Sequence, residues 1–165
     1  ALIPLYRQEG ELQAHREKMA YAALLSGITL AQVGLGSVHG LASPLGAFFP
    51  IPHGVVCGTL VASATRINIH SMSAREPNNT ALAKYWRTAE ILCQRRFIDP
   101  QVAFNKLIDL LAQWTNELAL PRLSHYGLQE TALDKVIAHC RGSSMKTNPI
   151  VLTDEEIRQI LLERL

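Results

Sequence analysis

The sequence has few charges, few cysteines and almost no strand-like alternation, and each shortage excludes a class of protein. Only 18% of the 165 residues are charged and the net charge is +2, so no strong field favours nucleic acid or an anionic membrane. Lys and Arg nowhere interleave with aromatic residues as in single-strand binders. Cys57, Cys93 and Cys140 form no CxxC pair, which is typical of reduced thiols in a cytoplasmic protein. No uninterrupted apolar run reaches membrane-spanning length.

What the sequence does contain is helical periodicity. Hydrophobic residues make up 48% of the chain, enough for one domain with a buried core. Cap patterns precede several periodic stretches: Asn79 before Thr80, Asp99 before Pro100, and Thr153 three residues before Glu156. We predict an all-α fold over residues 1–165, with helices near 11–26, 53–69, 80–94, 100–118, 131–140 and 154–165. The first of these is expected to be amphipathic, with Leu12, His15, Met19, Ala22, Ala23 and Ser26 on one face.

Residues 34–58 hold the most unusual stretch, because glycines and prolines crowd around two histidines, His39 and His53. Gly lowers helix stability and Pro removes a donor, so we predict a helix that ends at 39–42 and breaks near Pro44. A loop follows, and a second helix begins at His53 or Gly54. This geometry can bring two imidazoles to one point, and imidazole is the commonest protein metal ligand. The residues alone leave open whether the two histidines bind metal or are structural. The glycines at 27, 34 and 36 continue a helix-like stretch, where each costs about 1 kcal/mol against Ala, and they indicate close approach of a neighbouring helix or ligand.

Residues 38–54, VHGLASPLGAFFPIPHG, resemble the histidine signature of the iron-containing (group III) alcohol dehydrogenases, V-H-x-x-x-H-P-L-G-A-x-x-x-x-P-H-G. The segments AHREKMAYAALLSGITLAQVGLG at 14–36 and GSSMKTNPIVLTDEEIRQILLERL at 142–165 resemble the same family. Members have an N-terminal nucleotide-binding α/β domain and a C-terminal all-helical domain. The resemblance implies the helical bundle of the dehydroquinate-synthase-like and iron alcohol dehydrogenase fold, with the nucleotide-binding domain absent from this chain.

The resemblance also implies a metal site. In the family, the histidines that match His39 and His53 bind a divalent metal, Fe²⁺ or Zn²⁺, with an Asp and a His four apart supplied from upstream. Residues 1–33 contain no Asp, so the site in this chain is expected to be incomplete. The implied reaction is hydride transfer between an alcohol or aldehyde and NAD or NADP.

Three further residues belong to this implied site. Ser43 stands where the family commonly has a third histidine that helps to relay the alcohol proton, and a hydroxyl is a poor general base at neutral pH. Ser43 is therefore the catalytic position that departs from the family pattern. Phe48 and Phe49 lie between the two histidines in sequence. They either line a substrate pocket or pack in the core.

Several alternatives stay open. A glycerol-dehydrogenase-like or maleylacetate-reductase-like relative, or a helical module that has lost the chemistry, would carry the same resemblance. We predict that the isolated chain has no dehydrogenase activity, that no nucleic acid or membrane is a partner, and that the protein is cytoplasmic. A homodimer is one form open to the full-length protein. The opening letters ALIPLY read as the end of an element that begins elsewhere.

Overall fold

The computed structural model describes all 165 residues, and every regular element in it is a helix. The α-helices are α1 (Leu2–Tyr6), α2 (Leu12–Val33), α3 (Ser37–Phe48), α4 (His53–Arg75), α5 (Thr80–Cys93), α6 (Pro100–Glu117), α7 (Leu133–His139), α8 (Ser143–Lys146) and α9 (Asp154–Leu162), with 3-10 turns at Leu123–Tyr126 and Glu130–Ala132. The prediction of an all-α fold is confirmed. The short helices α1 and α8 were not predicted.

The cap patterns place helix starts correctly. The Asn79 side chain accepts a hydrogen bond from the backbone of Ala81, and Asp99 does the same from Gln101. Thr153 and Glu156 form a reciprocal capping box at the start of α9. Each cap satisfies a backbone N–H that the first helical turn leaves without a partner. These three starts are therefore encoded locally, and the structure confirms them.

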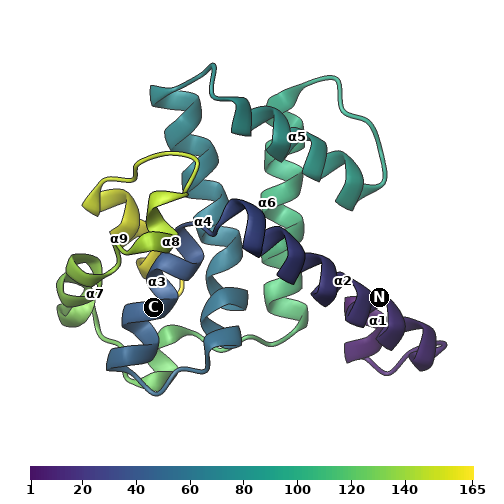
Figure 1. Cartoon of the computed structure of the whole chain (residues 1–165), viewed down its shortest axis with the longest axis horizontal. Helices are drawn as coiled ribbons and strands as arrows, with labels where there is room; N and C mark the ends of the chain where they lie inside the picture. The colour runs from purple at the N-terminus through teal and green to yellow at the C-terminus, as the bar shows by residue number, and fades with distance from the viewer.

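Helix α4 is the central element of the molecule (Figure 1). It packs against α3 and α9 on one side and against α5 and α6 on the other. A core of 21 buried residues, including Leu41, Leu60 and Ile157, joins α4 to α3, α7 and α9. A smaller core of six, including Ile69 and Phe104, joins it to α5 and α6. Because α4 contributes to both cores, its position fixes the other helices, and its first residue is His53.

Helix α2 differs from the rest because none of its residues is buried. Figure 1 shows α1 and the first half of α2 projecting beyond the other helices. Leu12, His15 and Met19 are half-covered, but the chain is exposed from residue 20 to 34. The predicted helix is thus confirmed and runs on through Gly27. Beyond Met19, however, the residues of the predicted apolar face (Ala22, Ala23 and Ser26) are exposed to solvent. An amphipathic pattern shows which side needs covering and not what covers it.

No single helix is long and apolar enough to cross a membrane. Helices α2 and α3 meet the length and composition criteria only when they are taken together, and they are bent by 99° at the break between them.

The predicted break at Pro44 is wrong, because α3 continues through this residue to Phe48. An interior proline costs a helix about 3 kcal/mol. Leu41 and Leu45 on either side are fully buried, and burying a leucine stabilises by about 2 kcal/mol, which offsets that loss. The chain leaves the helix instead at Phe49, whose extended backbone (φ −134°, ψ 149°) is the conformation that a following proline favours. The break is therefore at residues 49–52.

Candidate metal centre

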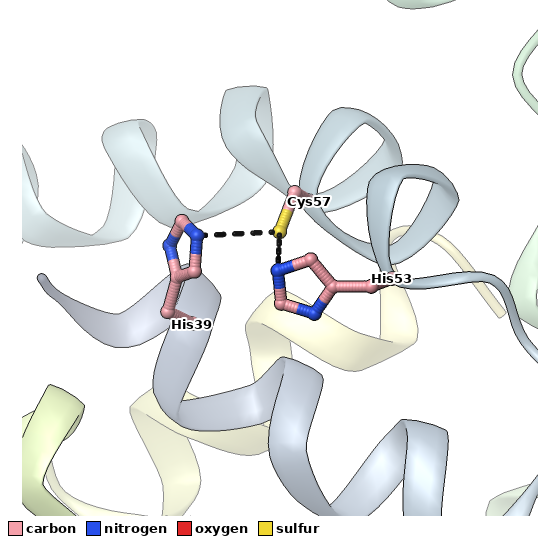
Figure 2. Close-up of side chains that lie close together, drawn as sticks. All are labelled: His39, His53 and Cys57. Carbon is pink, nitrogen blue, oxygen red and sulfur yellow. Dashed lines mark hydrogen bonds between the residues drawn. The ribbon is translucent and has the colours of Figure 1, made fainter. Parts of the chain in front are cut away.

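Helices α3 and α4 bring His39 and His53 together beside Cys57 (Figure 2). The two imidazole centroids are 5.3 Å apart, with the ring planes tilted by 53°. The Cys57 Sγ lies 3.7 Å from Nε2 of His39 and 3.5 Å from Nε2 of His53. The three donor atoms all lie within 4.8 Å of one another. The sequence predicted that the two rings would meet, and they do.

Cys57 is the member of this cluster that the sequence analysis missed, since it was interpreted only as a reduced thiol. Its signal was the spacing from His53. Residues four apart on a helix lie on the same face, about 5–6 Å apart at Cβ. His53 and Cys57 are the first and fifth residues of α4, so both side chains face α3. A histidine followed four residues later by a cysteine could have been singled out as a pair of metal ligands.

The start of α3, which carries His39, is held by Asn148. Its side-chain Oδ1 accepts a hydrogen bond of 3.0 Å from the backbone N–H of Ser37. Its side-chain Nδ2 donates to Asn68 Oδ1 on α4 at 2.9 Å and to the carbonyl of Ile150 at 2.8 Å. One amide group thus joins the beginning of α3 to the middle of α4, the two helices that carry the imidazoles.

The turn between α2 and α3 is held in the same way by Thr147. Its hydroxyl accepts from the backbone N–H of Leu35 at 3.1 Å and donates to the Leu35 carbonyl at 2.6 Å. Gly34 has a φ of +75°, and a Cβ at this position would lie 2.9 Å from the Thr147 Oγ1. A side chain at Gly36 would lie 3.1 Å from Asn148 Oδ1. The predicted close approach is confirmed at Gly34 and Gly36. It is wrong at Gly27, where an added Cβ would have no neighbour within 4 Å.

The electrostatics suit a metal-binding imidazole at His39. Burial lowers the pKa of this histidine, and the positive charge of His53 lowers it further. A neutral ring with a free lone pair is therefore the main form at pH 7. Burial has the opposite effect on the thiol and raises the pKa of Cys57. Without a cation, the sulfur carries its proton at neutral pH.

The donor set fits a divalent metal. Zn²⁺ bonds to His nitrogen at about 2.0–2.1 Å and to Cys sulfur at about 2.3 Å. Tetrahedral angles then place a nitrogen and a sulfur ligand about 3.6 Å apart. The measured Sγ–Nε2 separations of 3.7 and 3.5 Å match this spacing.

Ser43 and the two phenylalanines do not join the donor cluster. Ser43 is exposed on α3, one turn beyond His39. Phe48 and Phe49 are half-buried and pack against the larger core. The Phe48 ring meets the imidazole of His139 edge-on at 5.2 Å, and the ammonium of Lys135 lies 4.0 Å from its centroid. Their roles in proton relay and in substrate binding stay predictions.

A separate cleft lies away from these residues. It encloses about 400 Å³ between the end of α4, α5 and the start of α6. Its lining comprises Ser73, Pro77, Asn78, Asn79, Thr80, Leu82, Ala83, Trp86, Pro100 and Phe104. No histidine or cysteine is among these residues. The candidate metal centre is thus marked by its donor atoms and not by this cavity.

Comparison with known families decides the assignment. The model of the Fe-containing alcohol dehydrogenase family, C-terminal, matches residues 2–165. The chain belongs to this family. It is 31% identical over 172 residues to the 1-propanol dehydrogenase PduQ of Salmonella typhimurium, covering 99% of this chain and 44% of the relative. It is 29% identical over 157 residues to alcohol dehydrogenase 4 of Schizosaccharomyces pombe, covering 92% and 33%.

Solved structures confirm the predicted fold. A crystal structure of 1,3-propanediol oxidoreductase superimposes with a TM-score of 0.81 at 27% identity, over 94% of this chain and 39% of the other. The helical arrangement is therefore that of the family's C-terminal domain. The chain spans less than half the length of the curated relatives that it matches.

Proposed function

We propose that this chain is the metal-binding helical part of an NAD(P)-dependent alcohol dehydrogenase that uses a divalent metal, Fe²⁺ or Zn²⁺. The observation that carries the proposal is the meeting of His39 and His53. The two histidines of a family signature, fourteen positions apart in sequence, lie with their rings 5.3 Å apart. The family match adds support over nearly the whole chain.

The residues of this chain would hold and orient the metal. Nε2 of His39 and Nε2 of His53 supply lone pairs from two different helices, and Asn148 keeps those helices in register. A metal bound here supplies Lewis acidity, which lowers the pKa of an alcohol hydroxyl or polarises a carbonyl. NAD or NADP, and the remaining ligands, would come from the part of the protein that corresponds to the other half of its relatives.

Ser43, in place of the family's histidine, changes the route by which a proton would leave the alcohol. Its exposed hydroxyl lies one helical turn from His39, where it can pass a hydrogen bond to water. It does not titrate near neutral pH and therefore does not act as a base. We propose that water carries the proton beyond Ser43. Phe48 and Phe49 would restrict the apolar side of the substrate, an alcohol or aldehyde.

A second candidate follows from the same residue. Ser43 in place of the family's histidine favours either a related enzyme with another substrate, such as a glycerol-dehydrogenase-like or maleylacetate-reductase-like protein, or a helical module without catalysis. Stoichiometric metal in the full-length protein would favour an enzyme, and metal-free protein would favour the module.

The experiment measures metal and activity together. Full-length protein should contain about one Fe²⁺ or Zn²⁺ per chain and should reduce NAD or NADP in the presence of an alcohol. His39→Ala and His53→Ala should lose both properties. His125→Ala, an exposed histidine outside the cluster, should lose neither. Full metal content in His39→Ala protein would contradict the proposal. The isolated 165-residue chain should show no alcohol-dependent reduction above a His39→Ala control.

A further inference from the structure

We propose that Cys57 is a third ligand of the metal, so that this chain supplies two nitrogens and one sulfur and favours Zn²⁺ over Fe²⁺. The inference rests on the proposed function, because it concerns the same metal centre. It goes beyond that function by adding a donor that the family signature does not contain.

The geometry of the sulfur carries the proposal. In Figure 2 the Cys57 side chain points between the two imidazoles, and its Sγ faces Nε2 of each ring. The separations of 3.7 and 3.5 Å lie within about 0.1 Å of the edge expected for a tetrahedral zinc site. Hydrogen bonds between the thiol and the two rings have the same spacing, so the experiment below separates a metal ligand from a hydrogen-bonded thiol.

The backbone fixes these positions before any metal binds. His53 and Cys57 share one face of α4, so their spacing is set by the helix itself. His39 comes from α3, which packs on α4 through buried leucines that include Leu41 and Leu60. Asn148 adds a hydrogen-bonded connection between the same two helices, through Ser37 at the start of α3 and Asn68 on α4. The three donors are thus mounted on rigid elements, which is the requirement for a precise metal site.

The donor chemistry indicates which metal is preferred. Thiolate is a soft ligand, and sites that combine Cys sulfur with His nitrogen are typical of Zn²⁺. In the isolated chain, three protein ligands leave one position of a tetrahedron for water. In the full-length protein, ligands from the other part and the substrate would complete or expand the coordination. Binding replaces the S–H bond of Cys57 by a sulfur–metal bond and releases one proton to solvent. The step requires no oxidant or reductant.

The test uses Co²⁺, which takes the place of Zn²⁺ and gives a thiolate-to-metal charge-transfer band in the near ultraviolet. This 165-residue chain, titrated with Co²⁺, should develop that band at one equivalent. Cys57→Ser and Cys57→Ala should lack it. The matched control is Cys93→Ser, because Cys93 is also half-buried but lies outside the cluster. It should keep the band.

A second measurement does not depend on the spectrum. Zn²⁺ affinity, measured by competition with a chromogenic chelator, should fall by more than about ten-fold in Cys57→Ser. Loss of a residue that only hydrogen-bonds to a metal ligand already lowers metal affinity by about 10–100-fold, and loss of a ligand should cost at least as much. Bound Zn²⁺ should also slow alkylation of Cys57, but not of Cys93, as read by mass spectrometry. Thermal unfolding of each variant shows that it is folded.

The outcomes separate the two proposals. Co²⁺ bound through His39 and His53 without a charge-transfer band would overturn the role of Cys57 and leave the histidine site intact. The sulfur would then only exchange hydrogen bonds with the two rings. No Co²⁺ bound by any form of the chain would overturn the three-ligand site proposed for Cys57. The proposed function would then be decided by the metal content of the full-length protein, which supplies the remaining ligands. A charge-transfer band that persists in Cys57→Ser and disappears in Cys93→Ser would also overturn the assignment.

Discussion

At the scale of single residues, Asn148 shows how a side chain far along the sequence can position a site. It lies 111 residues from Ser37 and 80 from Asn68, yet it bonds to both. Asn68 is itself buried, and its amide nitrogen donates to Asn148 Oδ1 at 3.2 Å. Removal of the Asn148 amide would leave polar groups of Asn68 and Ser37 without their partners.

We therefore expect Asn148→Ala to lower the free energy of unfolding by about 2 kcal/mol, because an unpaired buried polar group costs about 1–3 kcal/mol. Urea unfolding followed by circular dichroism measures the difference. Asn148→Asp keeps the acceptor for Ser37 and should lose less than Asn148→Ala. Asn78→Ala, an exposed asparagine, should stay within about 0.5 kcal/mol of the parent. Equal stability of Asn148→Ala and the parent would show that this network does not hold α3 in place.

The residues of the candidate site were only partly predictable from the sequence. His39 and His53 could be singled out because breakers and a family signature surround them. Cys57 was missed although its spacing from His53 was available. What the sequence does not show is which face of that helix meets α3. Asn148 was not singled out as part of the site, since a contact made across 111 residues leaves no local pattern.

At the scale of elements, the starts of the helices with side-chain caps could be predicted from the sequence. Which helix packs on which could not. Asn79, Asp99 and Thr153 act within three residues of themselves, so their effect can be read locally. The continuation of α3 through Pro44 depends on the burial of Leu41 and Leu45, which is a property of the tertiary structure. The exposure of α2 depends on what packs beside it, and the periodicity of its sequence does not show which segment that is.

The capping box of α9 also connects this helix to α4. The Glu156 carboxylate accepts hydrogen bonds from the Thr153 N–H at 2.7 Å and from the Ser71 hydroxyl at 2.6 Å, and it pairs with Arg75 at 2.8 Å. Burial alone would raise the pKa of Glu156, but the hydrogen bonds from Ser71 and Thr153 and the charge of Arg75 outweigh it, so the pKa is lowered. The charged form is thus favoured in the folded protein.

This lowered pKa gives the fold a pH dependence of defined sign. A carboxyl with a lower pKa in the folded state stabilises the fold above its ordinary pKa, about 4.3, and loses that effect as the pH falls through the folded value. At pH 7 we expect Glu156→Gln to lower the free energy of unfolding by about 1 kcal/mol, because Gln can keep the contact to Thr153 but loses the charge-assisted bonds to Ser71 and Arg75. The difference from the parent should shrink as the pH falls below about 4.

The control is Glu155→Gln in the same first turn of α9, because Glu155 is exposed and takes no part in the capping box. It removes the same charge from the same helix start. Urea unfolding at a series of pH values compares the three proteins. A gap between Glu156→Gln and the parent that stays constant from pH 7 to pH 3 would contradict the linkage.

At the scale of the whole molecule, the two cores on either side of α4 hold different helices in place. The larger core fixes α3, α7 and α9 and so sets the position of His39 relative to α4, while the smaller core fixes α5 and α6. The candidate metal centre lies at the junction of α3 with α4, the first residue of which is His53. A cation bound there would contact both helices and would be lost when they separate.

Metal binding should therefore raise the melting temperature of the entire chain. A ligand that binds only the folded state stabilises it by about 2.7 kcal/mol at a free concentration of 100 Kd. For a chain of this size, about 1 kcal/mol corresponds to about 2–4 °C, so Zn²⁺ at this concentration should raise the Tm by about 5–10 °C.

The same zinc concentration should raise the Tm of His39→Ala and His53→Ala by much less, because each keeps only part of the donor set, and a chelator should reverse the shift in the parent. Differential scanning calorimetry with and without Zn²⁺ provides the measurement, and His125→Ala serves as the histidine control outside the cluster. An equal shift in the parent and in His39→Ala would mean that zinc stabilises the chain from another place. In that case the meeting of α3 and α4 would be a packing contact without a bound ion.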